Sequence, residues 1–168
     1  MNRGTGAASA MFFYAMVMVA GGVTAYALAP EGANAKTALI VPVVCAGAMV
    51  LSALLSLQIE RVYVLGMIGI HLGLVLPLLI AGAVGFRAVG VGGAVTKYHD
   101  TQREYAAALE KGEVENGQQA RTAYFEAREA PDHDKSYLRN TLWFLTFASI
   151  GSFGLILSKR PKKEDRGG

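Results

Sequence analysis

Four long stretches of apolar residues follow one another along the chain, joined by two short polar connections and one longer polar segment. The apolar stretches cover residues 11–30, 37–57, 62–86 and 137–158, and the longer polar segment covers residues 97–136. At about 1.5 Å per residue, a helix of about 20 residues crosses the roughly 30 Å hydrocarbon core of a bilayer. The pattern therefore predicts four membrane-spanning helices.

The predicted fold class is all-α: a polytopic membrane protein with four transmembrane helices and an extramembrane helical hairpin between the third and the fourth. This divides the chain into a three-helix membrane region (1–96), the hairpin (97–136), the fourth transmembrane helix (137–158) and a basic cytoplasmic tail (159–168). Composition supports this class, because 52% of the 168 residues are hydrophobic, 17% are charged and the mean hydropathy is +0.33. The expected surroundings are a lipid bilayer and other membrane subunits or further copies of the chain, with no nucleic acid.

The first apolar stretch has two interpretations. A signal peptide is one of them, since Ala33-Asn34-Ala35 has the pattern of a cleavage site. The apolar core is longer than the roughly 7–15 residues of a signal peptide, which favours a retained span. Phe12, Phe13 and Tyr14 then suit the aromatic belt at one membrane surface.

The positive charges outside the polar segment predict the orientation in the membrane. Arg3, Arg61 and the basic tail lie at both termini and in the second connection. Positively charged residues near the ends of spans stay on the cytoplasmic side. We therefore expect a multi-pass integral membrane protein with both termini in the cytoplasm and residues 97–136 on the opposite side.

Small residues four positions apart occur in three of the spans and predict close contacts between helices. The pairs are Ala48 and Ser52, Gly69 and Gly73, and Ala148 and Ser152. Pro77 cannot donate a backbone hydrogen bond, so it should kink the third helix near the middle of the membrane. Beyond Arg87, either this helix continues with a strong tilt, or Gly90, Gly92 and Gly93 form a flexible exit.

The polar segment has helical periodicity and carries aromatic side chains that suit a partner's surface. One helix should end at Gly112, and a second should run from about residue 118 to 129, before Pro131. The hairpin has too little apolar surface to fold alone. We expect its aromatic residues to contact a partner; these are Tyr98, Tyr105, Tyr124 and Phe125.

His71 is the most prominent candidate for chemistry, because an ionisable group within a span is costly and usually faces the bundle interior or a pathway. Its functional interpretations are an axial ligand of a haem-like or chlorophyll-like cofactor, a proton relay, or a polar contact to a substrate. The alternative is a neutral imidazole bonded to a carbonyl of a neighbouring helix. The identity of any cofactor stays open.

Arg87 also has two interpretations. It is an anchor whose head group reaches phosphate or water, or it is a counter-charge for an anionic substrate that enters between helices. The sequence Asp132-His133-Asp134 indicates a solvated helix start rather than a metal site, because adjacent residues do not converge on one ion. No nucleophile has a supporting base and no phosphate loop is present, so we expect no catalytic residues and no enzyme.

The first 90 residues resemble the small transmembrane protein 14 family. The resemblance rests on Gly21-Gly22 followed by Tyr26-Ala27 in the first span, and on Arg87 after a glycine-rich third span. The polar hairpin has no counterpart in that family, and the lysine and proline usual after the arginine are missing. The resemblance implies a four-helix bundle that helps hydrophobic anions, such as fatty acids or porphyrin precursors, to cross a membrane.

Two functions follow from these observations. In the first, the protein is a non-catalytic accessory or structural subunit of a larger membrane complex, docked through small-residue helix faces and the hairpin. In the second, it is a carrier or facilitator for amphipathic anions, with Arg87 near the mouth of the path. The hairpin favours the first.

Overall fold

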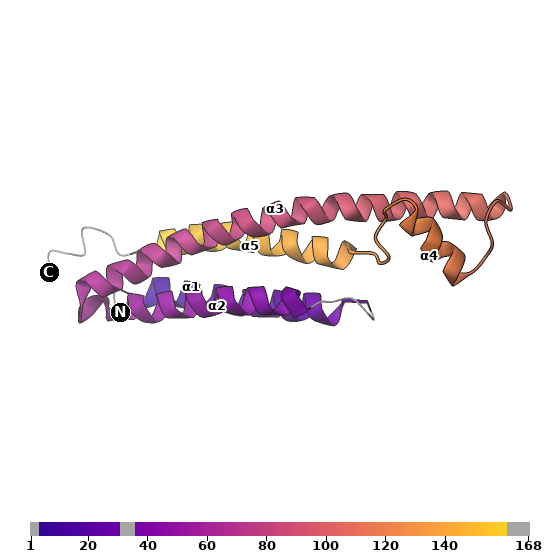
Figure 1. The fold of residues 1–168 in the computed structure, drawn as a ribbon. Coiled ribbons are helices and arrows are strands. Elements are labelled where there is room, and N and C mark those ends of the chain that lie inside the picture. Colours follow the sequence, from indigo (N-terminus) through magenta and orange to yellow (C-terminus); the bar gives the residue numbers. More distant parts are fainter. Residues whose placement is uncertain (1–3, 31–35, 161–168) are drawn as a thin grey trace.

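The computed structural model describes residues 4–30 and 36–160, and every regular element in these ranges is a helix (Figure 1). Their order is α1 (Thr5–Ala27), α2 (Lys36–Leu57), the 3₁₀ turn η1 (Gln58–Glu60), α3 (Tyr63–Glu110), α4 (Gln118–Glu126) and α5 (Ser136–Lys159). Four of these helices, namely α1, α2 (counted together with η1), α3 and α5, are long and apolar enough to cross a membrane, in the number that the sequence predicts. Arg3, the Ala33-Asn34-Ala35 segment and most of the basic tail lie outside the described residues.

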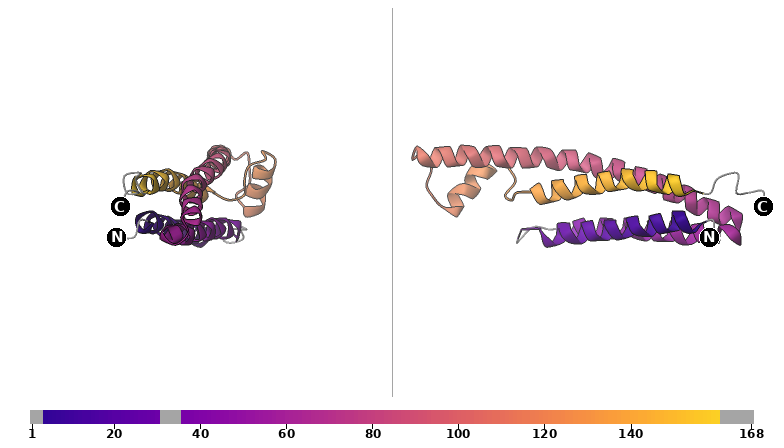
Figure 2. Two further views of the ribbon diagram at one scale, coloured as in Figure 1. Left: turned by 90° about the vertical axis from the view of Figure 1, so that its left-hand side faces the viewer. Right: turned by 180° about the vertical axis from the view of Figure 1, so that it is seen from behind.

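The four long helices form one bundle. In Figures 1 and 2, α1 and α2 form one layer, and α5 and the first half of α3 form the other. The described N-terminus, η1 and the end of α5 lie at one end of the bundle. The end of α1, the start of α2, the start of α5 and the middle of α3 lie at the other end. Large apolar side chains fill the space between the layers, among them Met11, Met18, Met49, Ile70 and Leu145.

Glycine allows the closest approach between α2 and α3. A Cβ atom built on Gly69 would lie 2.7 Å from the backbone oxygen of Ser52 and would also clash with the backbone nitrogen of Ser56. Ser52 is 1% exposed, and its hydroxyl donates to the carbonyl oxygen of Ala48 at 2.9 Å. A Cβ atom on Gly73 would instead meet the side chain of Met11 in α1. The predicted packing at these positions agrees with the contacts.

The buried face of α5 differs from the predicted one. Ala148 and Ser152 are only half-buried, whereas Ser149 has no exposed surface. Ser149 lies against Tyr14 of α1, with 2.6 Å between their hydroxyl oxygens. Tyr14 was expected in an interfacial belt, but α1 begins at Thr5, so this residue lies well inside the helix and is fully buried.

Helix α3 is a single element of 48 residues, about 72 Å long at about 1.5 Å per residue. It continues through Gly90, Gly92 and Gly93, so the alternative of a flexible exit is wrong. The division expected at residues 96 and 97 falls inside this helix. Pro77 is buried within α3 and does not end it, and Figure 1 shows the helix bending gradually along its length.

The end of α3 follows the prediction at Gly112. This glycine has a φ of 71°, and the N–H of Glu113 donates to the carbonyl of Ala108 at 2.9 Å. The N–H of Gly112 donates to the carbonyl of Leu109 at 3.1 Å, which completes a Schellman motif. The chain then turns back, and α4 packs against the last turns of α3.

Candidate functional site

A partly open cavity of about 290 Å³ lies between the four long helices, at the end of the bundle where α5 begins. Its walls are mostly apolar and include Met18 of α1, Pro42 of α2, Val84 of α3 and Leu145 of α5. Such a space, lined mainly by hydrophobic side chains with a few polar groups, is typical of small-molecule sites. The cavity is therefore the candidate functional site of this chain.

Arg87 supplies the positive charge at this cavity. It lies on α3 next to the wall residues Ala83 and Val84, and its side chain is exposed. Among the residues that the structure describes, none forms an ion pair or a hydrogen bond with Arg87. The guanidinium group therefore keeps its five N–H donors for solvent or for an anionic ligand.

Three hydroxyl-bearing residues complete the polar part of the lining. Thr37 comes from the first turn of α2, and Tyr137 and Thr141 come from the first turns of α5. The Thr141 hydroxyl donates to the carbonyl oxygen of Tyr137 at 2.9 Å, so its own oxygen can still accept a hydrogen bond. Thr37, Tyr137 and Thr141 lie near the starts of their helices and Arg87 lies halfway along α3, whereas Leu145 lies two turns after Tyr137 on α5.

The start of α5, which carries Tyr137 and Thr141, is fixed by the acidic residue Asp134. Its carboxylate accepts the N–H of Ser136 at 2.8 Å, and its second oxygen lies 3.7 Å from Nε2 of His99 on α3. Partial burial alone would raise the pKa of Asp134. The hydrogen bonds from Ser136 and the charges of His99 and Arg139 outweigh this effect and lower the pKa below its ordinary value of 3.8.

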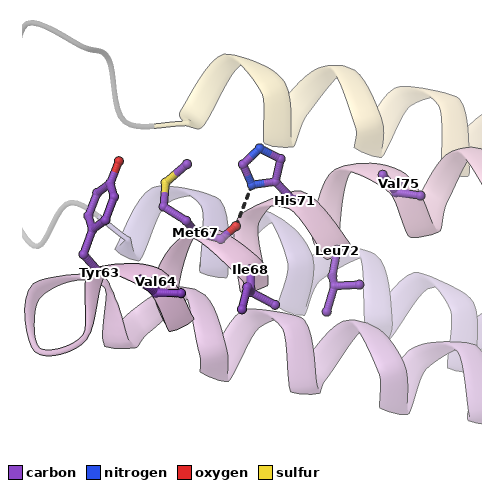
Figure 3. Close-up of a pocket in the computed structure, with 7 residues that line it drawn as sticks. All are labelled: Tyr63, Val64, Met67, Ile68, His71, Leu72 and Val75. Atoms are coloured by element: carbon purple, nitrogen blue, oxygen red, sulfur yellow. Dashed lines mark hydrogen bonds between the residues drawn. The ribbon is translucent and has the colours of Figure 1, made fainter.

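His71 occupies a place that the sequence did not predict. It was expected to face the bundle interior, but its side chain is exposed on α3. Its Nδ1–H donates to the carbonyl oxygen of Met67 at 2.7 Å, so the accepting carbonyl belongs to its own helix and not to a neighbour (Figure 3). A shallow apolar hollow formed by α3 side chains surrounds the ring.

The four aromatic residues expected to contact a partner contact each other instead. Tyr105 is 4% exposed and Phe125 is 2% exposed, and their ring centroids lie 6.5 Å apart. Tyr98 accepts a hydrogen bond from Arg121 at 3.0 Å, and Arg128 lies over the ring of Tyr124 at 3.6 Å. The expectation of a partner contact is therefore wrong for the buried Tyr105 and Phe125, because these rings hold α4 on α3.

The described ranges contain no group of three or more His, Cys, Asp or Glu side chains arranged to hold a metal ion, and His133 is exposed. Sequence reasoning identified Arg87 but missed the cavity, because its lining comes from four separate helices. It also missed the contact between Tyr14 and Ser149. The sequence offered one signal for this contact: Tyr14 and Ser149 are hydroxyl-bearing residues within two different apolar spans.

These observations define an all-helical protein with four candidate membrane-spanning helices, compatible with a multi-pass integral membrane protein. Comparison of the chain with protein-family models, with curated proteins and with solved structures found no match.

Proposed function

We propose that this protein is a multi-pass membrane protein that binds an amphipathic anion with a single alkyl chain in the cavity beside Arg87 and helps it to cross the bilayer. The proposal depends on one observation. Arg87 lies next to an apolar cavity, and no carboxylate among the described residues pairs with it. Charge-assisted hydrogen bonds from arginine suit a carboxylate, and the apolar walls suit a hydrocarbon tail.

The volume of the cavity favours a narrow ligand. About 290 Å³ holds roughly ten groups of the size of a water molecule, at about 30 Å³ each. A methylene group is of similar size, so one alkyl chain of moderate length fills this space. A four-ring macrocycle is too bulky for it. Of the two anions that the family resemblance implies, fatty acids are therefore the better candidates.

The position of Arg87 along α3 places the ligand's head group at a membrane surface. Arg87 lies 24 residues after Tyr63, the first residue of α3, which corresponds to about 36 Å of helix. This distance matches the thickness of a bilayer core with its inner interface. A carboxylate bound by Arg87 would stay near the lipid head groups, while its tail would lie inside the bundle. We place the termini on the cytoplasmic side and Arg87 near the opposite surface.

The accessory-subunit hypothesis depended on small-residue helix faces and on four aromatic side chains of the hairpin that were expected to contact a partner. Two of these are buried within the chain and the others make internal contacts. The carrier function therefore comes first in our proposal. A stable complex with other proteins in mild detergent, seen as a mass well above that of one or two copies, would restore the subunit hypothesis.

Binding of lauric acid and of dodecanol to the purified protein in lipid nanodiscs tests the proposal. These probes have tails of equal length and differ in the charged head group. Arg87→Gln should weaken binding of laurate about tenfold or more, since a hydrogen bond to a charged group contributes about 1.5–3 kcal/mol, and should leave dodecanol unchanged. Arg103→Gln is the matched control, because Arg103 lies on the same helix with its side chain 82% exposed.

A second variant tests the cavity itself. Ala83→Phe places a ring in the cavity wall and should weaken binding of both probes. In liposomes with an internal pH dye, the wild-type protein should also speed the entry of laurate, and Arg87→Gln should reduce this effect. Equal binding of laurate by the wild type and Arg87→Gln, or no effect of Ala83→Phe, would refute the proposed site.

A further inference from the structure

The cavity between the four long helices has a limited depth. Its lining extends from Ala25 to Met18 on α1 and from Tyr137 to Leu145 on α5. Ala25 lies seven residues after Met18, and Leu145 lies eight residues after Tyr137, so the two helices give depths of roughly 10 and 12 Å. An extended alkyl chain advances about 1.3 Å per carbon, because its C–C bonds of about 1.5 Å form a zigzag. The depth therefore accommodates about nine carbons, close to the number that the volume of the cavity accommodates.

Leu145 closes the deep end of the cavity. Its side chain is part of the lining and is 2% exposed, and the neighbouring lining residue Met18 is 1% exposed. The side chain of Leu145 lies directly against the backbone of Gly21 on α1. A Cβ atom built on Gly21 would lie 2.6 Å from Cδ2 of Leu145 and 3.3 Å from its Cγ. Leu145 therefore occupies a slot that exists because residue 21 is glycine.

A pair of hydrogen bonds closes the bundle one turn beyond Leu145. Ser149 follows Leu145 by one turn on α5, and Tyr14 precedes Met18 by one turn on α1. The two hydroxyl oxygens lie 2.6 Å apart, and the Ser149 hydroxyl also donates to the carbonyl oxygen of Leu145 at 2.6 Å. Neither Tyr14 nor Ser149 has exposed surface. A ligand that extended past Leu145 would have to disrupt these buried bonds, and leaving a buried polar group without a partner is costly.

We propose that Leu145, seated beside Gly21 and supported by the contact between Tyr14 and Ser149, sets the longest alkyl chain that the cavity accepts. This inference rests on the proposed function, because it concerns the tail of the same ligand. Arg87 selects the charged head group, whereas Leu145 selects the length of the tail. A longer chain must either bend inside the cavity or hold its head group away from Arg87.

Binding of a series of straight-chain carboxylates to the full-length protein in lipid nanodiscs tests this inference. The probes are octanoate, decanoate, laurate, myristate and palmitate, compared at equal mole fraction in the lipid so that their different partition into the bilayer cancels. The wild type should bind decanoate and laurate with similar affinity. It should bind palmitate at least about fivefold more weakly, since overpacking opposes the longer tail.

Two variants should shift this length limit in opposite directions. Leu145→Ala removes three carbon atoms from the end of the cavity, so the limit should move to chains about three carbons longer and palmitate should bind at least about fivefold more tightly than to the wild type. Gly21→Ala pushes the Leu145 side chain into the cavity, so laurate should bind more weakly while octanoate is unaffected. Leu155→Ala is the matched control, because Leu155 lies on the same helix and is 40% exposed. It should keep the wild-type series.

The same series for the wild type, Leu145→Ala and Gly21→Ala would overturn the inference, and so would shifts of both variants in one direction. A general loss of stability does not produce opposite shifts, and Gly21→Ala decides the question alone if Leu145→Ala does not fold. Failure here differs from failure of the proposed function. If Arg87→Gln weakens laurate binding but neither variant shifts the series, the role of Leu145 is wrong and the role of Arg87 stands. If the series shifts but Arg87→Gln binds laurate as the wild type does, the role of Leu145 stands and the role of Arg87 is wrong.

Discussion

Replacement of Gly69 by alanine should weaken the packing of α2 against α3. The added Cβ atom would lie 2.7 Å from the backbone oxygen of Ser52 and 2.8 Å from the carbonyl carbon of Leu55. These are backbone atoms, which cannot rotate away as a flexible side chain can. The two helices must therefore separate, and overpacking of this kind costs about 1–3 kcal/mol.

Gly82 on the same helix is the matched control, because a Cβ atom there meets nothing within 4 Å. Replacing glycine by alanine in a helix gains about 0.8–1.0 kcal/mol of intrinsic propensity at either position. This gain cancels when the two variants are compared. Gly69→Ala should therefore have a free energy of unfolding about 1–3 kcal/mol below that of Gly82→Ala.

Reversible unfolding in bicelles by added sodium dodecyl sulfate measures this difference. The fluorescence of Trp143, the single tryptophan of the chain, and the helical circular dichroism signal report the transition. Equal free energies of unfolding for the two variants, within about 0.5 kcal/mol, would contradict the close approach of α2 and α3.

Three further predictions concern other contacts. Phe125→Ala should release α4 from α3 and speed tryptic cleavage near α4, because truncation of a fully buried phenylalanine costs about 3–5 kcal/mol. Tyr14→Phe should lower the free energy of unfolding by about 1 kcal/mol, whereas Ser149→Ala should lower it by about 1–3 kcal/mol, because only the second leaves a buried hydroxyl without its partner. Asp134 has a lowered pKa, so its stabilising effect is present above pH 3.8 and is lost as the pH falls through the folded value. The NMR signal of the Ser136 amide should titrate below pH 3.8 in the wild type but not in Asp134→Asn.

Each of these predictions has a result that contradicts it. Unchanged proteolysis of Phe125→Ala would mean that other contacts hold α4. A larger decrease in the free energy of unfolding for Tyr14→Phe than for Ser149→Ala would contradict the assignment of Tyr14 as the hydroxyl left without a partner. A titration of the Ser136 amide that persists in Asp134→Asn would assign it to a different carboxyl group.

Local pattern was sufficient for the elements whose neighbours lie close in sequence. The bounds of α2 and the end of α3 at Gly112 follow from apolar runs and from one glycine that adopts a positive φ. Gly69 and Ser52 were predicted as packing positions because small residues allow any neighbouring helix to come close. The burial of Tyr105 and Phe125 was not predictable in the same way, since it depends on how α4 folds back onto α3.

The errors also have a physical cause. His71 was expected to face inward because ionisable groups in a membrane usually do, but its Nδ1–H is satisfied by the preceding helical turn. The three glycines after Arg87 were possible hinge residues by composition. The ends of this region are held by contacts between α3 and α5 and by the cluster around Phe125, so the helix continues through it.

The exposed large apolar side chains of α3 end partway along the helix. Phe86 is 85% exposed and Val89 is 64% exposed, and Val89 is the last large apolar side chain exposed on this helix. Beyond it, the aromatic side chain of Tyr105 is covered by α4. Exposed phenylalanine is costly in water and costs little in lipid, so the proposed placement in a bilayer puts the boundary between lipid and water close to Phe86 and Val89. In this proposed placement Arg87 lies at the boundary, its guanidinium group meets water, and the adjoining cavity extends into the apolar layer. This is the arrangement that a ligand with an anionic head and an apolar tail requires.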